Sequence, residues 1–321
     1  MTTYAHKRNY TTEAVLAGMK SSQGFFLNCV LAIFLIIALT TIIWIKSKNI
    51  GAFSDDYFLI AYTIFLTGFQ LMRITSALFY KSSFKRITTE LTTKVQNAKY
   101  EPKVTCVIPC MNEEGAIDTT IRQCYAADYP RKKLEVIVIN DGSTDRTGEI
   151  IDELKRTEFP DMRIVHWKKN KGKREGMNAG FRLATGEIII QLDSDSYIVP
   201  HTFKKIIEPF KNPAIGAVCA HADPQNADQN WISKMQAAYY FMAFRILKAA
   251  ESTFGLVFCC SGCSSAYRRS IVMPLLKPWL AEVFMGKKVT WGDDRALTSH
   301  VIKAGFKTVY TDEARAVTIV P

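Results

Sequence analysis

Two long apolar stretches that together contain a single charged residue fill most of the first 80 residues. The first, Phe25 to Ile45, has 21 residues, and Asn28 is its only strongly polar side chain. A helix of this length is about 30 Å long, which is the thickness of the hydrocarbon core of a membrane. The second, Tyr57 to Tyr80, has Gln70 and Arg73 as its only strongly polar residues apart from its hydroxyl side chains. The pattern predicts two transmembrane helices within residues 25–80; burial inside a soluble domain is the alternative for each.

A different pattern begins at Lys103, where short apolar runs alternate with stretches of helical periodicity. This alternation predicts an α/β fold with a Rossmann-like, mostly parallel sheet. The predicted strands are Val104–Ile108, Leu134–Ile139, Met162–Trp167 and Glu187–Leu192, and the predicted helices are Gly115–Tyr125, Gly176–Ala184 and Arg295–Ala304.

A further helical stretch, Trp231 to Thr253, forms either one long helix or two. Five large apolar side chains recur along it at helical spacing. They are Trp231, Met235, Tyr239, Met242 and Ile246. We interpret this stripe as core or membrane-interface packing.

The charges are distributed unevenly between these two parts. Residues 1–100 carry 11 Lys and Arg against 4 Asp and Glu, whereas residues 101–321 carry 30 against 26. Most of the net charge of +11 therefore lies outside the α/β part, which argues against a nucleic-acid partner. Basic residues flank the pair of apolar stretches on both sides, and the loop between the stretches is balanced in charge. By the positive-inside rule, the N-terminus and everything after residue 80 lie in the cytoplasm.

These patterns together predict a multi-pass protein of the cell membrane, and the lipid bilayer is one of its partners. We expect a cytoplasmic arm over residues 1–24 and two transmembrane helices with a short external loop over 25–80. A basic juxtamembrane linker over 81–102 then leads to a cytoplasmic α/β domain over 103–321. Because the cytoplasm is reducing, the eight cysteines are expected to be thiols.

Acidic side chains follow two of the predicted strands. Asp141 comes directly after Leu134–Ile139 and Asn140, and Asp193-Ser-Asp195 follows Glu187–Leu192. Ligands of open parallel sheets bind beyond the carboxyl ends of the strands. Two carboxylates one residue apart on extended backbone can face a phosphate, with one of them as ligand to Mg²⁺ or Mn²⁺. A turn or a helix cap without chemistry is the alternative for both clusters.

Two further clusters carry candidate chemistry. Lys171-Gly-Lys-Arg174 places three cations before a helix, which suits a pyrophosphate, although a solvated basic loop is the default interpretation. Trp291-Gly-Asp-Asp-Arg295 opens a helix with two acids, one of which can act as a general base while the other caps the helix. An acidic helix start without chemistry is the alternative here.

The cysteines of Cys259-Cys-Ser-Gly-Cys263 have a spacing that suggests zinc at first sight. No second Cys pair or His pair with ligand spacing follows them, so we do not predict a zinc site. Ser261-Gly262 within this segment is instead predicted to be a close-approach loop.

The order of these clusters resembles processive family 2 glycosyltransferases of the hyaluronan synthase and rhizobial chitin-oligosaccharide synthase type. The resemblance covers about residues 100–321. Its motifs are Val107-Ile-Pro-Cys-Met-Asn-Glu113, Asn140-Asp-Gly-Ser-Thr-Asp145, Lys171-Gly-Lys-Arg174, Asp193-Ser-Asp195, Ser261-Gly262 and Gly292-Asp-Asp-Arg-Ala-Leu-Thr298. The last of them, followed by Ala304-Gly-Phe-Lys-Thr-Val-Tyr310, is the most diagnostic.

The resemblance implies a GT-A fold and inverting transfer of a sugar, N-acetylglucosamine above all, from a UDP donor to a saccharide acceptor. Asp141 would contact uridine, and Lys173 and Arg174 the nucleotide and diphosphate. Asp193 and Asp195 would form the donor site and hold Mg²⁺ or Mn²⁺. Asp294 would be the base that deprotonates the acceptor, with Asp293 beside it as a second catalytic residue. The other residues that the resemblance assigns to donor binding are Pro109, Asn112, Glu113, Ser261, Gly262 and Arg295.

The sequence departs from the family pattern at its end. Members of the family continue into a Gln-x-x-Arg-Trp segment and further transmembrane spans, and this pentapeptide does not occur in the 321 residues. We expect either a gene fragment or a shortened relative that transfers one or few sugars, for example to a lipid. A UDP-sugar-binding membrane subunit that is catalytically incomplete is the alternative from another functional class.

Overall fold

The computed structural model describes residues 57–89 and 100–320, together with nine helical positions between residues 33 and 48. The chain forms two compact units, Met1–Gln70 and Leu71–Pro321. Within the described residues, helix α3 (Tyr57–Leu78) is the one helix long and apolar enough to cross a membrane. It corresponds to the second predicted span. The first predicted span, over residues 25–45, lies mostly outside the described residues.

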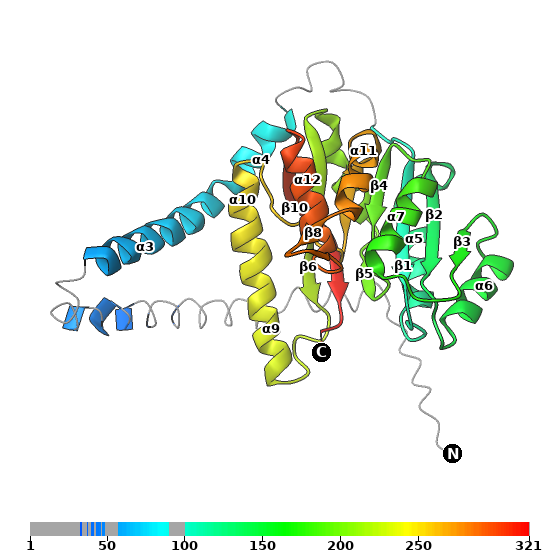
Figure 1. Cartoon of the computed structure of the whole chain (residues 1–321), viewed down its shortest axis with the longest axis horizontal. Helices are drawn as coiled ribbons and strands as arrows, with labels where there is room; N and C mark the ends of the chain where they lie inside the picture. The colour runs from blue at the N-terminus through cyan, green and yellow to red at the C-terminus, as the bar shows by residue number, and fades with distance from the viewer. Residues whose placement is uncertain are drawn as a thin grey trace. The chain divides into compact units, whose positions relative to one another are not determined.

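The second unit is built on an eight-stranded sheet (Figure 1) with the strand order β3-β2-β1-β4-β7-β6-β10-β5. The strands are β1 (Val104–Cys110), β2 (Leu134–Asn140), β3 (Arg163–His166), β4 (Ile188–Gln191), β5 (Ser196–Ile198), β6 (Ile215–Pro224), β7 (Ser265–Arg268) and β10 (Lys307–Thr318). β1 pairs in parallel with β2 and β4, as do β2 with β3 and β6 with β10. β7 and the edge strand β5 are antiparallel to their neighbours. The predicted GT-A-like α/β fold with a mostly parallel sheet is confirmed.

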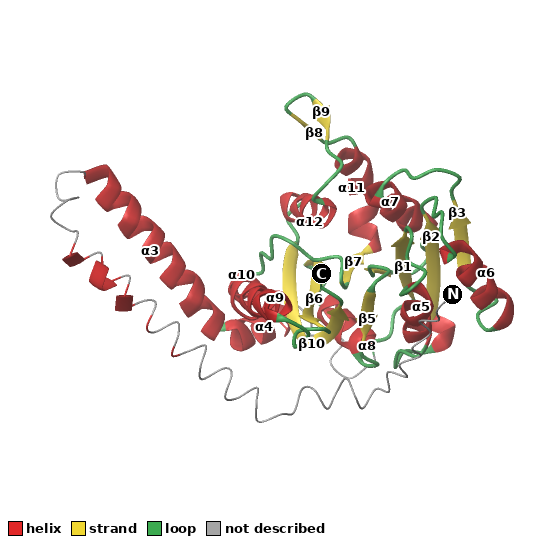
Figure 2. Cartoon of the chain, turned by 90° about the horizontal axis from the view of Figure 1, so that it is seen from below, coloured by secondary structure: helices red, strands yellow, loops and turns green. Residues whose placement is uncertain are grey.

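Helices cover both faces of this sheet (Figure 2). One face carries α5 (Ile117–Tyr125), α6 (Thr147–Thr157), α8 (Thr202–Ile207) and the 3₁₀ turn Glu208–Lys211; the other carries α7 (Lys173–Leu183), α11 (Arg269–Leu280) and α12 (Asp293–Lys303). A second 3₁₀ turn, Arg131–Lys133, directly precedes β2. A small hairpin of β8 (Val283–Phe284) and β9 (Lys287–Lys288) projects between α11 and α12.

The alternation of side chains along the strands explains why a hydrophobic core lies on each face of the sheet. Successive residues of a strand point to opposite faces of the sheet. Cys106 and Ile108 of β1 accordingly belong to the hydrophobic core under α5 and α8, while Val107 belongs to the core under α7 and α11. Gly180 permits α7 to approach β1, because a Cβ there would lie 2.2 Å from Val107 Cγ1. Because β1 is buried on both faces, its residues are apolar except Thr105, whose hydroxyl donates to Glu135 Oε2 at 2.5 Å.

The predicted stretch Trp231 to Thr253 is one helical rod with three parts. These parts are α9 (Trp231–Phe241), a π-helical turn (Met242–Lys248) and α10 (Ala249–Thr253). Trp231, Met235 and Tyr239 are exposed, so within the described structure the first half of the predicted stripe is a surface feature. The interpretation of that half as core packing is therefore not supported.

Helix α4 (Tyr80–Thr89) packs on the sheet unit although it precedes the predicted domain boundary at residue 103. Ile87 is buried in the core, and the hydroxyl of Tyr80 donates to the backbone oxygen of Tyr310 at 3.0 Å. The compact unit accordingly begins at Leu71.

Candidate functional site

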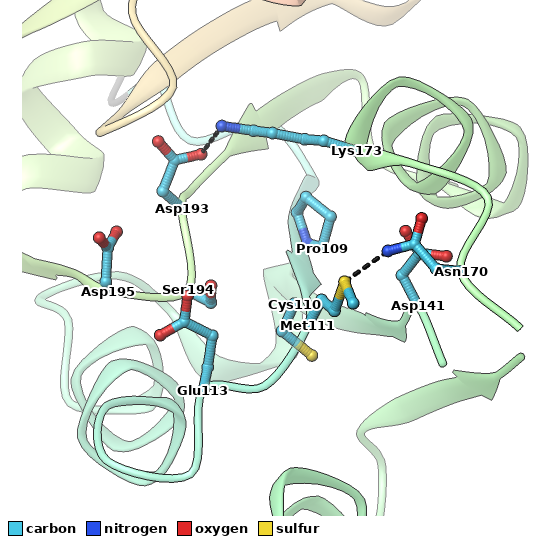
Figure 3. A pocket seen from close by; sticks show the side chains of 10 residues that line it. All are labelled: Pro109, Cys110, Met111, Glu113, Asp141, Asn170, Lys173, Asp193, Ser194 and Asp195. Atoms are coloured by element: carbon cyan, nitrogen blue, oxygen red, sulfur yellow. Dashed lines mark hydrogen bonds and ion pairs between the residues drawn. The ribbon is translucent and has the colours of Figure 1, made fainter. Parts of the chain in front are cut away.

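A polar pocket lies at the carboxyl ends of β1, β2 and β4. Its volume is about 290 Å³, and Figure 3 shows the side chains around it. They are Pro109, Cys110, Met111, Glu113, Asp141, Asn170, Lys173, Asp193, Ser194 and Asp195. Six of the residues predicted from the sequence to bind the donor or a metal therefore line one pocket: Pro109, Glu113, Asp141, Lys173, Asp193 and Asp195.

The loop after β1 is fastened to the loop after β2. The backbone N–H of Asn112 donates to Ser143 Oγ at 3.0 Å, and Asn112 Oδ1 accepts from the backbone N–H of Thr144 at 2.8 Å. Asn112 has a φ of 55°, in the left-handed region that asparagine tolerates. The backbone N–H of Glu113 donates to Thr147 Oγ1 at 2.7 Å. Asn112 thus holds two loops together and is not among the residues that line the pocket.

Asp141 connects the second strand to the loop that leads into α7. The backbone N–H of Lys171 donates to its Oδ1 at 2.6 Å, and that of Gly172 donates to its Oδ2 at 2.9 Å. Gly142 follows with a φ of 72°, and a Cβ there would lie 2.7 Å from the backbone of Lys169 and Asn170. The buried carboxylate of Asp141 therefore fixes the Lys171–Gly172 loop while it lines the pocket.

Acidic side chains dominate the opposite wall of the pocket. Burial raises the pKa of Asp195, and the neighbouring Asp193 carboxylate raises it further. Burial also raises the pKa of Glu113, with additional repulsion from Asp195. The ammonium of Lys173 forms an ion pair with Asp193 Oδ1 at 2.6 Å (Figure 3). Burial lowers the pKa of Lys173, but the Asp193 and Asp294 carboxylates outweigh this effect, so the pKa is raised and Lys173 is a cation.

The chemistry of this wall fits a hard divalent cation. Within residues 57–89 and 100–320, no group of three or more His, Cys, Asp or Glu side chains converges as a ready metal cage. Mg²⁺ usually binds through one or two carboxylates and completes its shell with water and substrate phosphates. Asp193 and Asp195 supply two carboxylates of that kind beside an open pocket, and their mutual repulsion favours a cation between them.

Asp294 lies in the first turn of α12, next to this wall. Its Oδ2 accepts from the backbone N–H of Gly262 at 2.7 Å, and its Oδ1 accepts from Gln191 Nε2 at 3.3 Å. The hydroxyl of Thr298 donates to the backbone oxygen of Asp294 at 2.6 Å. Burial raises the pKa of Asp294; Lys173 lowers it and Asp193 raises it. The residue is therefore a better proton acceptor than an ordinary aspartate.

Gly262 contacts both Asp193 and Asp294. Its carbonyl accepts from the backbone N–H of Asp193 at 3.0 Å, and its own N–H donates to Asp294. A Cβ at this position would lie 2.6 and 2.7 Å from the Asp193 carboxylate oxygens. The predicted close approach at Ser261-Gly262 is thus made by Asp193.

The structure does not bring Arg174, Asp293 and Arg295 to the pocket wall. Arg174 is buried, its Nε donates to Asp293 Oδ1 at 2.9 Å, and its Nη1 donates to Glu282 Oε2 at 3.2 Å. Three backbone oxygens accept the remaining bonds of its guanidinium, those of Trp279, Val289 and Trp291. Asp293 is thereby engaged in an ion pair, and Arg295 is exposed.

Two residues that the sequence did not single out belong to the site. Asn170 lines the pocket and hydrogen-bonds to the sulfur of Met111. Gln191 is fully buried at the end of β4 and contacts Asp294. A lone amide in an otherwise apolar strand was the available signal for Gln191. Asn170 lies in a basic loop and carried no comparable signal.

Comparisons with known proteins agree with this arrangement. The sequence model described as Glycosyl transferase family 2 matches residues 105–276. An N-acetylglucosaminyltransferase of Sinorhizobium fredii (strain NBRC 101917 / NGR234) is 32% identical over 235 residues, which are 73% of this chain and 57% of the relative. An N-acetylglucosaminyltransferase of Rhizobium meliloti (strain 1021) is 32% identical over 221 residues, 68% of this chain and 52% of the relative. The chain thus spans about half the length of the curated relatives it matches.

Two solved structures share the fold at low sequence identity. The mannosyltransferase PcManGT from Pyrobaculum calidifontis, in complex with GDP-Man and Mn²⁺, has a TM-score of 0.56 and 23% identity over 78% of this chain and 69% of its own. GalNAc-T7 with UDP, GalNAc and Mn²⁺ has a TM-score of 0.51 and 15% identity over 70% of this chain and 45% of its own. These similarities extend to the fold alone.

Proposed function

Because the chain belongs to glycosyl transferase family 2, we propose that it is an inverting glycosyltransferase that transfers N-acetylglucosamine from UDP-N-acetylglucosamine to a saccharide acceptor. The donor sugar is inferred from the relatives named N-acetylglucosaminyltransferase. We further propose that the enzyme is membrane-anchored, of the hyaluronan or chitin synthase type, with its site in the cytoplasm. Helix α3 supports the anchoring, since it is long and apolar enough to span a bilayer.

One observation carries this proposal above all. Gly262 links the pocket that holds Lys173, Asp193 and Asp195 to Asp294, a carboxylate with a raised pKa. Transfer of a sugar needs a diphosphate site and a proton acceptor on either side of the anomeric carbon. Gly262 contacts Asp193 of the proposed diphosphate site and Asp294, the proposed proton acceptor.

The residues divide the reaction between them as follows. Lys173 lies where its ammonium can attract the diphosphate, and Asp141 fixes the loop that carries Lys173. Mg²⁺ or Mn²⁺, when held by Asp193 and Asp195, supplies positive charge against the diphosphate oxygens; Mn²⁺ is also present in both structural relatives. The acceptor hydroxyl oxygen forms a bond to the anomeric carbon while the bond to the UDP oxygen breaks. Asp294 takes the hydroxyl proton, and UDP leaves with the bonding electrons.

Replacement of Asp294 by asparagine tests the assignment of the base. The chain, reconstituted in membranes with Mg²⁺ or Mn²⁺, is expected to release UDP from UDP-N-acetylglucosamine when acceptor is present. Asp294→Asn removes the proton acceptor but keeps the shape, so transfer falls by about 10²- to 10⁴-fold while UDP still binds. Asp228→Asn, at an exposed position outside the pocket, is the matched control. Full turnover of Asp294→Asn contradicts the assignment.

The products of the same assay distinguish the branches of the proposal. A polymer formed only with added UDP-glucuronic acid indicates the hyaluronan type, and a polymer from UDP-N-acetylglucosamine alone indicates the chitin type. A single added sugar indicates one transfer per acceptor. If the chain binds UDP but forms none from UDP-N-acetylglucosamine, it is a nucleotide-binding subunit, and this outcome contradicts the proposed transferase activity of this chain.

A further inference from the structure

Gln191 occupies an unusual place at the end of β4. Ile188 and Ile190 point into the core under α5 and α8, and Ile189 points into the core under α7 and α11. The two-residue repeat of a strand turns Gln191 to the same face as Ile189, which is the face that carries α12. Its side chain is 0% exposed. A buried amide is costly unless both of its ends are hydrogen-bonded.

Both ends of the Gln191 amide have partners. Its Nε2 donates to Asp294 Oδ1 at 3.3 Å, and its Oε1 accepts from Ser265 Oγ at 3.5 Å. Ser265 lies directly opposite Gln191 in the antiparallel pair of β4 and β7. An ionised carboxylate only accepts hydrogen bonds, so the NH₂ group of the amide must face Asp294. The hydroxyl of Ser265 satisfies the amide oxygen at the other end.

The carboxylate of Asp294 is therefore held at both oxygens. The backbone N–H of Gly262 fixes Oδ2, and the side chain of Gln191 fixes Oδ1. Removal of Gln191 leaves one fixed oxygen, and the carboxylate is then free to rotate about its χ2 torsion, which is soft for aspartate. A second donor from a strand, an element fixed by its pairing with β1 and β7, prevents this rotation.

We propose that Gln191 is a positioning residue for sugar transfer, which orients the carboxylate of Asp294 toward the acceptor hydroxyl. This inference rests on the proposed function, because it takes Asp294 as the base. It extends that function by a residue that touches neither donor nor acceptor. Correct orientation of a reacting group can change a rate by two orders of magnitude.

The kinetic test compares two substitutions of similar size with a matched control. Gln191→Met keeps the length but removes the donor, so kcat is expected to fall about 10- to 100-fold while KM for UDP-N-acetylglucosamine stays unchanged. Gln191→Glu keeps the shape but places a second carboxylate against Asp294, so its kcat falls further. Gln123→Met is the control, since Gln123 bonds to the backbone of Ile198 outside the pocket. Equal activity of parent, Gln191→Met and Gln191→Glu overturns the proposal, as does a raised donor KM with unchanged kcat.

Hydrogen exchange of the full chain tests the same inference without any turnover. A carboxylate that rotates holds the N–H of Gly262 for a smaller fraction of the time, so deuterium uptake in the segment around residues 259–263 is expected to be faster in Gln191→Met than in the parent. Ser265→Ala, a smaller change that removes the partner of the amide oxygen, is expected to give an intermediate increase. Unchanged uptake in both folded variants overturns the proposal. Absence of transfer by the parent chain would refute the proposed function, and the exchange result would still show whether Gln191 holds the carboxylate of Asp294 in place.

Discussion

Gly262 shows how one residue without a side chain can organise a site. Asp193 and Asp294 come from segments about one hundred residues apart, and both contact Gly262. The carboxylate of Asp193 occupies the space that a Cβ would need. The φ of Gly262 does not lie in the left-handed region, so glycine is not required here for its backbone conformation. It is required because only a residue without a Cβ permits this close approach.

Substitution of Gly262 by alanine should therefore damage the site. A methyl group 2.6 Å from a carboxylate oxygen of Asp193 must displace that side chain and with it the ion pair to Lys173. We expect a loss of activity of about 10²-fold, measured as kcat/KM for the UDP-sugar. Gly115→Ala is the control, because a Cβ there meets no atom within 4 Å. Equal losses in both variants would contradict this explanation.

The pH dependence of transfer should reveal the influence of Lys173 on Asp294. A base acts in its deprotonated form, so kcat falls as the pH drops through the pKa of Asp294, which burial raises above that of an ordinary aspartate. Lys173 lowers this pKa, so Lys173→Met should raise it and move the acid limb of the kcat profile to higher pH. Lys168→Met, at an exposed position of the loop before α7, should leave the limb in place. A limb that stays fixed in Lys173→Met would refute the coupling.

At the scale of elements, the start of α7 has two neighbouring cations with different tasks. Lys173 points to the pocket, whereas Arg174 is turned into the protein and bonds to the end of α11, the start of α12 and the segment between them. Helical geometry separates successive side chains by about 100°, so adjacent residues face different surroundings. From the sequence alone, Lys173 and Arg174 were both predicted to be cations of one basic loop and could not be distinguished.

Removal of the Arg174 guanidinium should mainly cost stability. Arg174→Met leaves Asp293 and Glu282 without their buried partner, which we expect to lower the free energy of unfolding by about 3 to 5 kcal/mol. Arg182→Met, exposed on the same helix, should change it by less than about 1 kcal/mol. Denaturant unfolding measures both values. UDP affinity measured on the folded fraction of Arg174→Met should equal that of the parent, and a selective loss of affinity would instead support a direct nucleotide contact.

At the scale of the whole molecule, α3 and the sheet unit expose different kinds of surface. The described apolar side chains of α3 are largely exposed, which suits lipid, while the sheet unit has two buried cores and a polar pocket. The positive-inside rule predicts that the sheet unit lies in the cytoplasm.

Cysteine labelling in intact cells tests that topology. Ser54→Cys lies in the predicted external loop, so a membrane-impermeant maleimide should label it without lysis. Ser82→Cys, exposed in α4 after the apolar stretch, should be labelled only after lysis. Labelling of Ser82→Cys in intact cells would reverse the predicted orientation.

The sequence by itself determined the fold class, four of the eight strands of the sheet and most of the pocket. Apolar strands that end in polar residues place those residues at one edge of a parallel sheet, so Asp141, Asp193 and Asp195 could be brought together from the pattern. Such inferences depend on local periodicity and on the common direction of the strands. They require no knowledge of side-chain directions in distant segments.

Only the tertiary structure decided which neighbours share the pocket and which lie behind it. Arg174 and Asp293 were predicted to belong to the site, but they form an ion pair with each other behind it. Gln191 was not predicted, and it belongs to the site because it contacts Asp294, more than one hundred residues away in the sequence. The link through Gly262 also depends on the packing of three segments. Long-range hydrogen bonds of this kind follow from the packing of helices on the sheet, which no local pattern of residues encodes.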